Sequence, residues 1–447
     1  MSDLIDLDKL QRDAARLVEA ARKAGADACD VVVAHGQTLV VNVREGKVEN
    51  TGRSEADDVS LRVFCGKRVA SVSANSLDAI DELATRAVAM ARVSPEDKYQ
   101  GLAPADRLAT EFPDLDLFDE FEPDADFLTA KAMAAEAAGI AVEGVSKSMG
   151  TGAGWGVTGF VLATSEGFAG NYRASRHTVS ASMVSGEGTE MERDYDFHSA
   201  AHPEDLKSPE EIGSSAGERV VRRRNPRQCD SGAMPVIYDR RVATGLLGGL
   251  LGAVNGASVA RKTSFLRECM HQLVANPAIT VIDDPLRPRG LGSHPFDGEG
   301  MPSAPLEIVT QGHLNCWLLD WAAARELDLE SNGRASRGGA GTSPSSSNCH
   351  VEPGITSVED MIAGLERGLL LTETIGHGVN MVTGDYSKGA SGFMIENGEV
   401  TFPVSEITIA GNLKEMFKSM LPASDLEFRG SVNAPSLLVE GMTVGGK

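Results

Sequence analysis

An uncharged, glycine-rich stretch at residues 242–260 constrains the fold of this chain more than any other segment. It contains five glycines and no Asp, Glu, Lys or Arg. Leu246, Leu247 and Leu250 lie at helical spacing, so the pattern predicts a helix buried in a protein core. Each interior glycine costs such a helix about 1 kcal/mol relative to alanine. The helix therefore needs a physical reason for lacking so many side chains.

The chain length predicts two domains. A single hydrophobic core seldom extends beyond roughly 250 to 300 residues, and this chain has 447. The polar stretch "NPRQCDSG" is a suitable linker. We therefore expect one domain at residues 1–225 and a second at residues 232–447.

The predicted first domain consists of two successive rounds of helix, strands and helix. In each round, segments with period-two alternation follow an amphipathic helix. The residues of the two rounds are not visibly similar, so the order of elements alone suggests an internal duplication. The first round comprises a helix at 7–23, strands at 30–34, 38–44, 59–65 and 68–74, and a helix from Ser76 to Met90; the second comprises a helix at 125–141, strands at 154–163, 168–172, 177–184 and 191–197, and a helix capped by Ser208.

The predicted second domain is rich in strands. Asp239 is placed to cap the glycine-rich helix, and Asn397-Gly398 is typical of a hairpin turn. Many short strands with intervening capped helices indicate an α+β fold. The expected elements are strands at 233–239, 279–282 and 306–310, a helix at 319–327, a long glycine- and serine-rich loop at 336–354, a helix at 358–371 capped by Ser357, and further strands up to the C-terminus.

Charge and cysteine usage exclude several classes of protein. The formal charge of -22 repels nucleic-acid phosphates, so direct DNA binding is not expected. The six cysteines include no C-x-x-C pair, and the first residues do not resemble a signal peptide. The glycine-rich stretch also contains Thr244 and Asn255, which disfavour membrane insertion. We expect a cytoplasmic protein with reduced thiols and no membrane contact.

Few residues form a recognisable catalytic or metal-binding pattern. None of the nine histidines lies in an H-E-x-x-H motif. The adjacent Cys349 and His350 are of zinc-ligand type but have no identifiable third partner. The stretch "GTGAGWG" at 150–156 lacks the lysine and the helix of a phosphate loop and is read as a turn. Four acids, Asp283, Asp284, Asp297 and Glu299, are either ligands of a hard cation or, more simply, part of a solvated loop.

Several motifs resemble the PmbA/TldE branch of the TldD/PmbA family, whose members have been described as modulators of DNA gyrase. The motifs are "GLGSHPFDGEG", "GLLLTETIGHGVNMVTGDYSKGASGFMIENGEV", "PVSEITIAGNL" and "APSLLVEGMTVGG", with "AGADACDVVV" and "LRVFCGKRVASVSAN" near the N-terminus. The resemblance therefore covers nearly the whole chain.

The resemblance offers a second explanation for the glycines of this helix. In the sister TldD branch this helix has H-E-x-x-x-H, whose histidines hold a metal and whose glutamate is the expected base. Here Gly248 and Ala253 occupy the histidine positions and Gly249 occupies the glutamate position. These residues offer neither a ligand nor a base, so no metal is expected in this chain. The glycines then serve either close backbone packing or a shared interface or substrate chamber.

The resemblance implies a peptidase built from two homologous subunits, with zinc or a similar metal in the TldD-type partner. This chain is then the subunit without metal, inactive alone, which shapes a channel for unfolded peptides and forms a homodimer in the absence of its partner. Exposed strand edges were the expected peptide contacts, and the loop at 336–354 was expected to gate or line the path. The edge residues are Gly389, Ser391, Phe393, Ile407 and Ile409. Two alternatives remain: a regulatory protein that acts on gyrase or on a toxin-antitoxin pair, and an independent hydrolase that uses Cys349-His350.

Overall fold

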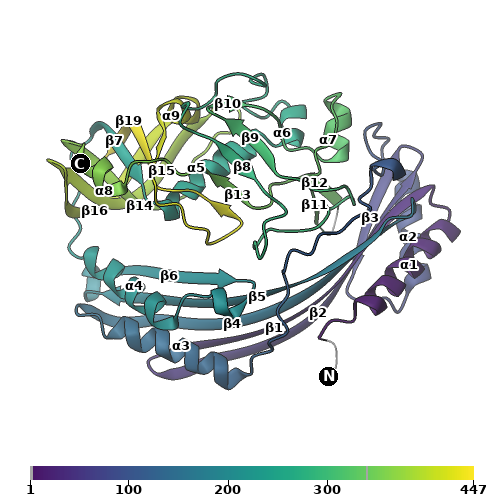
Figure 1. The fold of residues 1–447 in the computed structure, drawn as a ribbon, viewed down its shortest axis with the longest axis horizontal. Helices are drawn as coiled ribbons and strands as arrows, with labels where there is room; N and C mark the ends of the chain where they lie inside the picture. Colours follow the sequence, from purple (N-terminus) through teal and green to yellow (C-terminus); the bar gives the residue numbers. More distant parts are fainter. Residues whose placement is uncertain (1–3, 339–340) are drawn as a thin grey trace.

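The protein consists of a long curved sheet and a second, strand-rich body that lies on the concave side of that sheet (Figure 1). The structure, a computed structural model, describes residues 4–338 and 341–447. Helices and strands are mixed in both bodies, and the predicted α+β class is confirmed.

The first sheet has six antiparallel strands in the order β3-β2-β1-β4-β5-β6. Its central pair, β1 and β4, joins the two rounds of the sequence, because each round contributes three neighbouring strands. Short apolar and polar segments that the sequence pattern separates are merged into long continuous strands. The strands are β1 (Ala28–Arg44), β2 (Lys47–Cys65), β3 (Arg68–Ala74), β4 (Val145–Thr164), β5 (Ala169–Ser185) and β6 (Glu192–Ala200).

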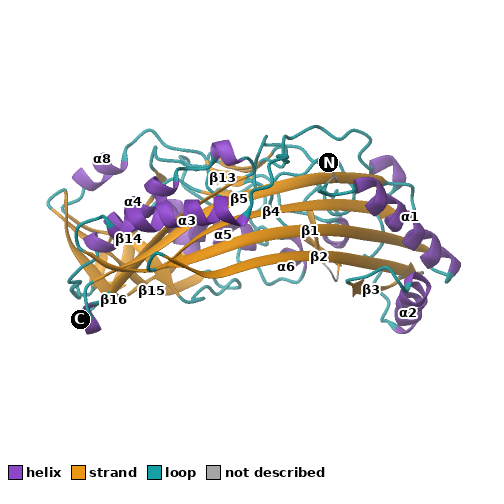
Figure 2. Ribbon diagram, turned by 90° about the horizontal axis from the view of Figure 1, so that it is seen from below, coloured by secondary structure: helices purple, strands orange, loops and turns teal. Residues whose placement is uncertain are grey.

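Four helices cover the convex face of this sheet (Figures 1 and 2). They share one hydrophobic core with the inward residues of the strands, including Val41 and Trp155. The helices are α1 (Leu7–Lys23), α2 (Ile80–Val93), α3 (Ala125–Ile140) and α4 (Pro209–Arg222), and short 3-10 turns lie at Ala105–Arg107, Gly188–Glu190 and Pro203–Asp205. The order helix, three strands, helix thus occurs twice.

Helix capping was predicted correctly at Ser208 and wrongly at Ser76. The Ser208 side chain accepts from the backbone N–H of Glu211, and the Glu211 carboxylate accepts from the backbone N–H of Ser208, which completes a capping box. The Ser76 hydroxyl instead contacts Asp78, and α2 begins four residues later at Ile80, without a side-chain cap. The polar residues at 76–78 form a turn before the helix.

The main sheet of the second body closes into a ring. Its strand order is β16-β15-β14-β7-β19-β17, and β16 also pairs with β19. The strands are β7 (Gly232–Tyr238), β14 (Arg367–Ile375), β15 (Asp385–Glu396), β16 (Glu399–Asn412), β17 (Leu421–Pro422) and β19 (Leu437–Gly445). The glycine-rich segment forms α5 (Arg240–Ala253), which Asp239 caps as predicted, and a separate short helix α6 (Gly256–Ala260).

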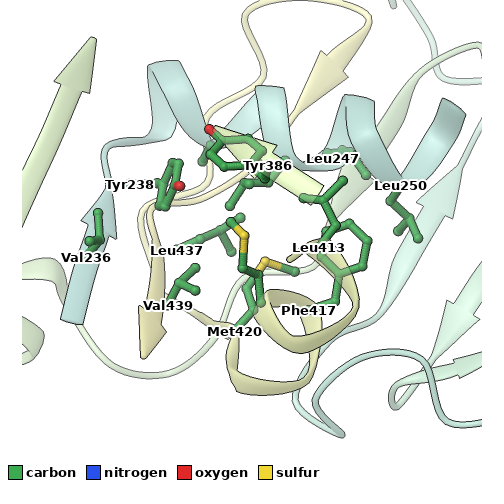
Figure 3. Close-up of a cluster of buried hydrophobic side chains, with 14 of the residues drawn as sticks. Val236, Tyr238, Leu247, Leu250, Tyr386, Leu413, Phe417, Met420, Leu437 and Val439 are labelled. Atoms are coloured by element: carbon green, nitrogen blue, oxygen red, sulfur yellow. The ribbon is translucent and has the colours of Figure 1, made fainter. Parts of the chain in front are cut away.

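One face of α5 packs into the core of the second body. Leu247 and Leu250 point toward Leu413 and Phe417 of α9 (Leu413–Ser419), beside strands β7 and β19 (Figure 3). The remaining elements surround this core: a small sheet of β8 (Val281–Asp283), β9 (Leu306–Thr310), β10 (His313–Leu314), β13 (Cys349–Val351) and β18 (Val432–Asn433), the hairpin β11 (Ala335–Gly338) and β12 (Gly341–Pro344), and helices α7 (Trp321–Glu326) and α8 (Val358–Ala363).

Two sequence predictions fail in the local structure. The helix expected at 358–371 ends at Ala363, because residues 369–371 form buried central positions of β14 between β7 and β15. The expected turn at 150–156 lies inside the continuous strand β4, paired on both sides. Within the described ranges, no helix is both long and apolar enough to span a lipid bilayer.

Candidate functional site

A cleft lies between the concave face of the first sheet and the second body. One hollow in this cleft encloses about 530 Å³, a volume within the range of ligand pockets, which is roughly 300 to 1,000 Å³. The floor comes from β1, β4 and β5, and the opposite wall comes from Gly290, Leu291 and Ser293 of the second body. The cleft is thus built by residues from both halves of the chain.

Strand glycines leave backbone exposed on the floor of this cleft. Gly152, Gly154 and Gly156 line the cleft together with the intervening Ala153 and Trp155, whose side chains are buried in the core shared with the helices. Because successive side chains of a strand point to opposite faces, the alternation "GTGAGWG" leaves backbone exposed along one face only. On the neighbouring strand β5, the residues opposite these glycines are Ser180, Thr178 and Arg176. The floor therefore offers hydroxyl groups and backbone within a lining that is mostly apolar.

A second hollow of about 300 Å³ lies at the end of the same boundary, beside α5. Arg223 of the first body pairs with Glu373 of β14 at 2.5 Å, and Arg241 of α5 pairs with Asp194 of β6 at 2.9 Å. These ion pairs cross between the two bodies. Gly245 lines the hollow next to them, so the glycine-rich helix borders the cleft.

The glycine face of α5 is open. Gly245 and Gly248 are exposed, and a Cβ added to either would meet no atom within 4 Å. At Gly249 and Gly252 an added Cβ would approach only the flexible side chains of Leu413 and Met381, at 3.2 and 3.1 Å. Close packing of another backbone of this chain therefore does not explain these four glycines, and that interpretation is wrong for α5.

Gly256, at the start of α6, is the exception among the glycines of the stretch. A Cβ there would lie 2.6 Å from the carbonyl oxygen of Leu318 and 2.5 Å from Leu319. Close packing accounts for this glycine. The stretch at 242–260 therefore combines one glycine required by packing with two exposed glycines, Gly245 and Gly248, beside which no described part of the chain lies close.

The side chains of α5 at residues 248–253 include no metal ligand. Gly248 and Gly249 carry no donor side chain, and Ala253 is fully buried in the core. Across residues 4–338 and 341–447, no three His, Cys, Asp or Glu side chains are grouped so as to hold a metal ion. The chemistry of a bound metal therefore has no protein ligands at this helix.

The expected peptide-binding edges are not free edges. Gly389, Ser391 and Phe393 lie on β15, which pairs with β14 on one side and β16 on the other. Ile409 pairs with Lys388 of β15 and with Val444 of β19. Ile407 is buried too, and strand closure leaves no row of backbone groups for a peptide. The prediction of strand addition at these residues is wrong.

The four acids of 283–299 are held by arginine side chains and backbone N–H groups. Asp283 is fully buried against Arg334, with 2.5 Å between the carboxylate and Nε. Asp297 accepts from the backbone N–H groups of Glu299, Met301 and Ala335. The expected solvated loop is wrong for three of the acids, because Asp283, Asp297 and Glu299 are buried and only Asp284 is partly exposed. Burial raises the pKa values of Asp297 and Glu299 above their ordinary range.

The first part of the serine-rich loop forms the hairpin β11–β12, and the loop joins the two bodies. Arg337 of β11 and Arg62 of β2 both bond to the buried Asp30 of β1, at 2.7 and 2.5 Å. Thr342 accepts from Arg62 and donates to Glu299. The loop also borders a hollow of about 260 Å³. Residues 339–340 of the expected gate lie outside the described residues.

Cys349 and His350 do not form a hydrolytic pair. They are neighbours on β13, so their side chains point to opposite faces. Cys349 is fully buried, and this burial raises the pKa of its thiol well above the ordinary value. His350 lies beside Glu352 at 3.3 Å and against the ring of Phe428. A protonated, inaccessible thiol is not a nucleophile.

Comparison with known families finds three matching segments. Residues 231–446 match the PmbA/TldA metallopeptidase C-terminal domain, residues 29–91 match domain 1, and residues 118–224 match the central domain. Domain 1 matches the first round of strands and the central domain matches the second, and the two rounds together form the first sheet.

Similar proteins extend over almost the full length. Metalloprotease PmbA of Escherichia coli O157:H7 is 35% identical over 429 residues, which cover 94% of this chain and 93% of that protein. A metalloprotease PmbA homolog of Haemophilus influenzae is also 35% identical, covering 96% of this chain and 94% of the homolog.

Solved structures share the fold. A proposed modulator of DNA gyrase from Bacteroides thetaiotaomicron superposes with a TM-score of 0.91 at 27% identity, covering 98% of this chain and 99% of that one. TldE from Thermococcus kodakarensis superposes with a TM-score of 0.86 at 20% identity, covering 97% and 100%.

Proposed function

The chain belongs to the PmbA/TldD metallopeptidase family, and on that premise we propose that it is the subunit without metal in a two-subunit peptidase. A TldD-type partner supplies the metal and the catalytic base. This chain supplies part of the chamber in which an unfolded peptide is held.

The observation that carries the proposal is the open glycine face of α5. Helix positions at which the sister branch has ligands are glycine and alanine here, and Gly245, one of the two exposed glycines, borders the hollow at the boundary between the two bodies. Glycines in a helix cost stability, and no described part of this chain requires the exposed ones. The open face of α5 leaves space for an extended peptide or for a partner subunit, and this space is the function that we assign to the exposed glycines.

The floor of the cleft suits an extended peptide of varied sequence. Gly152, Gly154 and Gly156 leave room for side chains of the peptide, while Thr178 and Ser180 offer hydroxyl groups to its backbone. Contacts of this kind recognise peptide groups rather than particular side chains. A folded protein would not enter, because the second body covers the sheet (Figure 1).

The experiment compares the purified chain, a TldD-type subunit of the same organism, and their mixture on an unstructured peptide. We expect turnover by the mixture, no turnover by this chain alone, and no stoichiometric metal in this chain by elemental analysis. Gly154→Leu, which fills the cleft, should lower turnover by the mixture. Lys67→Leu, at an exposed turn, is the matched control.

The results separate the proposal from its alternatives. Turnover by this chain alone would favour an independent hydrolase. The TldD-type subunit is also assayed with a different partner. If it is active there but shows no turnover when mixed with this chain, a regulatory protein is favoured. Normal turnover by the mixture that contains the Gly154→Leu variant would show that the cleft does not hold the peptide.

A further inference from the structure

Arg176 lies in the floor of the hollow of about 530 Å³, on the concave face of the first sheet. β5, which passes beneath the second body (Figure 1), carries Arg176 on the same face as Thr178 and Ser180. Of the described residues that line this hollow, Arg176 alone has an ionisable side chain. The whole chain has 64 acidic and 42 basic residues, so a cleft with a positive charge and no negative one departs from the charge balance of the protein.

The Arg176 side chain has no partner in the part of the chain that the structure describes. It is exposed and makes no hydrogen bond, ion pair or aromatic contact there. Other arginines at the boundary between the two bodies are paired, Arg223 with Glu373 and Arg241 with Asp194. The guanidinium of Arg176 therefore keeps its five N–H donors available inside the cleft, where a ligand would meet them.

The neighbours of Arg176 across the sheet are small. Gly156 lies opposite Arg176 on β4, and β6 ends with Ala200 opposite His177. Ala201, the next residue, also lines the hollow. Neither glycine nor alanine has a side chain that reaches a guanidinium, so the space around the positive charge is free for a group of a ligand.

The hollow is closed next to Arg176. The backbone N–H of Ser175 donates to the carbonyl oxygen of Leu117, a residue that lines the hollow. Two residues earlier, the carbonyl oxygen of Leu115 accepts from the backbone N–H of Arg289 of the second body. This segment therefore bridges β5 and the second body. An extended chain that lies along β5 from the other end of the hollow stops at this bridge.

We propose that the closed end of the hollow binds the C-terminal carboxylate of an unfolded peptide, with Arg176 as the residue that recognises it. The inference rests on the proposed function, because it assigns a substrate class to the same cleft. A guanidinium donates two parallel N–H bonds to a carboxylate, which gives both affinity and orientation. A chain terminus fits a closed end, whereas an acidic side chain within a peptide requires the main chain to continue past it.

Strand geometry determines how far such a peptide reaches. A β-strand extends by about 3.3 Å per residue. Six positions separate Ser182 from Arg176 on β5, a distance of about 20 Å. Ser182 lines the second hollow together with Gly245 of α5. A peptide anchored at Arg176 therefore needs about six extended residues to reach the glycine face of α5.

The test compares an unstructured peptide with a free C-terminal carboxylate and its C-terminal amide. The peptide has about eight residues, which exceeds the required reach, contains no Asp or Glu, and carries an uncharged fluorophore at its N-terminus. Fluorescence anisotropy gives the Kd for this chain alone, and turnover gives the KM for the mixture with a TldD-type subunit. The wild-type chain should bind the carboxylate about tenfold more tightly than the amide, because the amide cannot form the charged pair.

Substitutions assign the preference to Arg176. Arg176→Gln should weaken binding of the carboxylate to the level of the amide and leave binding of the amide unchanged. Arg176→Lys keeps the charge without the paired donors and should retain part of the preference. Arg12→Gln, at an exposed and equally unpaired arginine of α1, is the matched control and should bind both peptides as the wild type does. Melting midpoints check that each variant is folded.

A third peptide separates the two sources of a carboxylate. It has one internal glutamate and a C-terminal amide. We expect it to bind as weakly as the amide without glutamate, because its main chain cannot continue past the closed end. Binding as tight as that of the free C-terminus would overturn the assignment to a chain terminus.

The remaining outcomes also decide the proposal. If neither the Kd for this chain nor the KM for the mixture differs between carboxylate and amide, Arg176 does not recognise a peptide terminus. The same conclusion follows if the preference persists in Arg176→Gln or disappears in Arg12→Gln. Carboxylate-dependent binding without turnover by the mixture would contradict the proposed function alone. Turnover without any preference for the carboxylate would contradict this inference alone.

Discussion

Alanine at two exposed glycines of α5 should stabilise this protein while impairing its function. Gly245 and Gly248 lie inside the helix, and neither has a positive φ. An added methyl group at either position meets no atom within 4 Å. The substitution therefore removes the entropic cost of glycine without introducing a clash.

The magnitude follows from helix propensity. Each Gly→Ala change at such a position contributes about 0.5 to 1 kcal/mol, so the double variant Gly245→Ala/Gly248→Ala should gain about 1 to 2 kcal/mol. For a body of this size, that gain raises the melting midpoint by roughly 2 to 8 °C. Thermal and urea unfolding, followed by circular dichroism, measure the change.

Gly256→Ala is the matched control from the same stretch. Its Cβ would lie 2.6 Å from the Leu318 carbonyl oxygen, so the substitution overpacks the site. Overpacking typically costs about 1 to 3 kcal/mol, and the control should change stability in the opposite direction.

Peptide turnover by the mixture with a TldD-type subunit provides the functional half of the test. We expect the double variant to be more stable and less active, because the methyl groups narrow the face that the glycines keep open. Loss of stability in the double variant would refute the structural reasoning. Greater stability with unchanged turnover would refute the functional reasoning.

Three further predictions concern buried groups. Burial raises the pKa of Glu299, so the folded state retains a proton there that the unfolded state releases; the resulting stability is present at low pH and is lost as pH rises through the raised pKa. Glu299→Gln should therefore flatten the decline of the unfolding free energy between about pH 5 and 9, as measured by urea titration. Arg334→Met leaves Asp283 buried without its cation and should cost about 3 to 5 kcal/mol in the same assay, whereas Arg289→Met, at an exposed cluster, should cost less. Cys349 should react with a thiol reagent only after unfolding, and Cys349→Ala should not lower turnover by the mixture; rapid labelling of the native thiol would contradict its burial.

Elements with local signals were predicted well from the sequence. α1 has the predicted bounds, Leu7–Lys23, because its apolar spacing and the following glycine are both local. The turn at Asn397-Gly398 was also predicted correctly, since both residues have the positive φ that such turns require. The predicted helix at 358–371 overruns into β14 because three consecutive leucines do not distinguish a buried helix from a buried strand.

The candidate site was harder to predict because its residues are brought together by long-range pairing. The open face of α5 and the cleft floor at Gly152–Gly156 are far apart in sequence and face the same boundary only after the chain folds. A signal was nevertheless present at 150–156, where glycine alternates with larger residues at the period of a strand. The ion pairs of Asp30 with Arg62 and with Arg337, which connect the two bodies, have no comparable pattern in the sequence.

Ring closure by β19 has a consequence for biosynthesis. The first sheet has all of its strands by Ala200, whereas the ring of the second body contains β7 near its start and lacks the second neighbour of β7 until Leu437–Gly445 has been made. While the ribosome translates the intervening residues, the edges of β7 and β16 that β19 will occupy remain open to other chains. The later half of the nascent polypeptide thus passes through an aggregation-sensitive interval that the earlier half does not share.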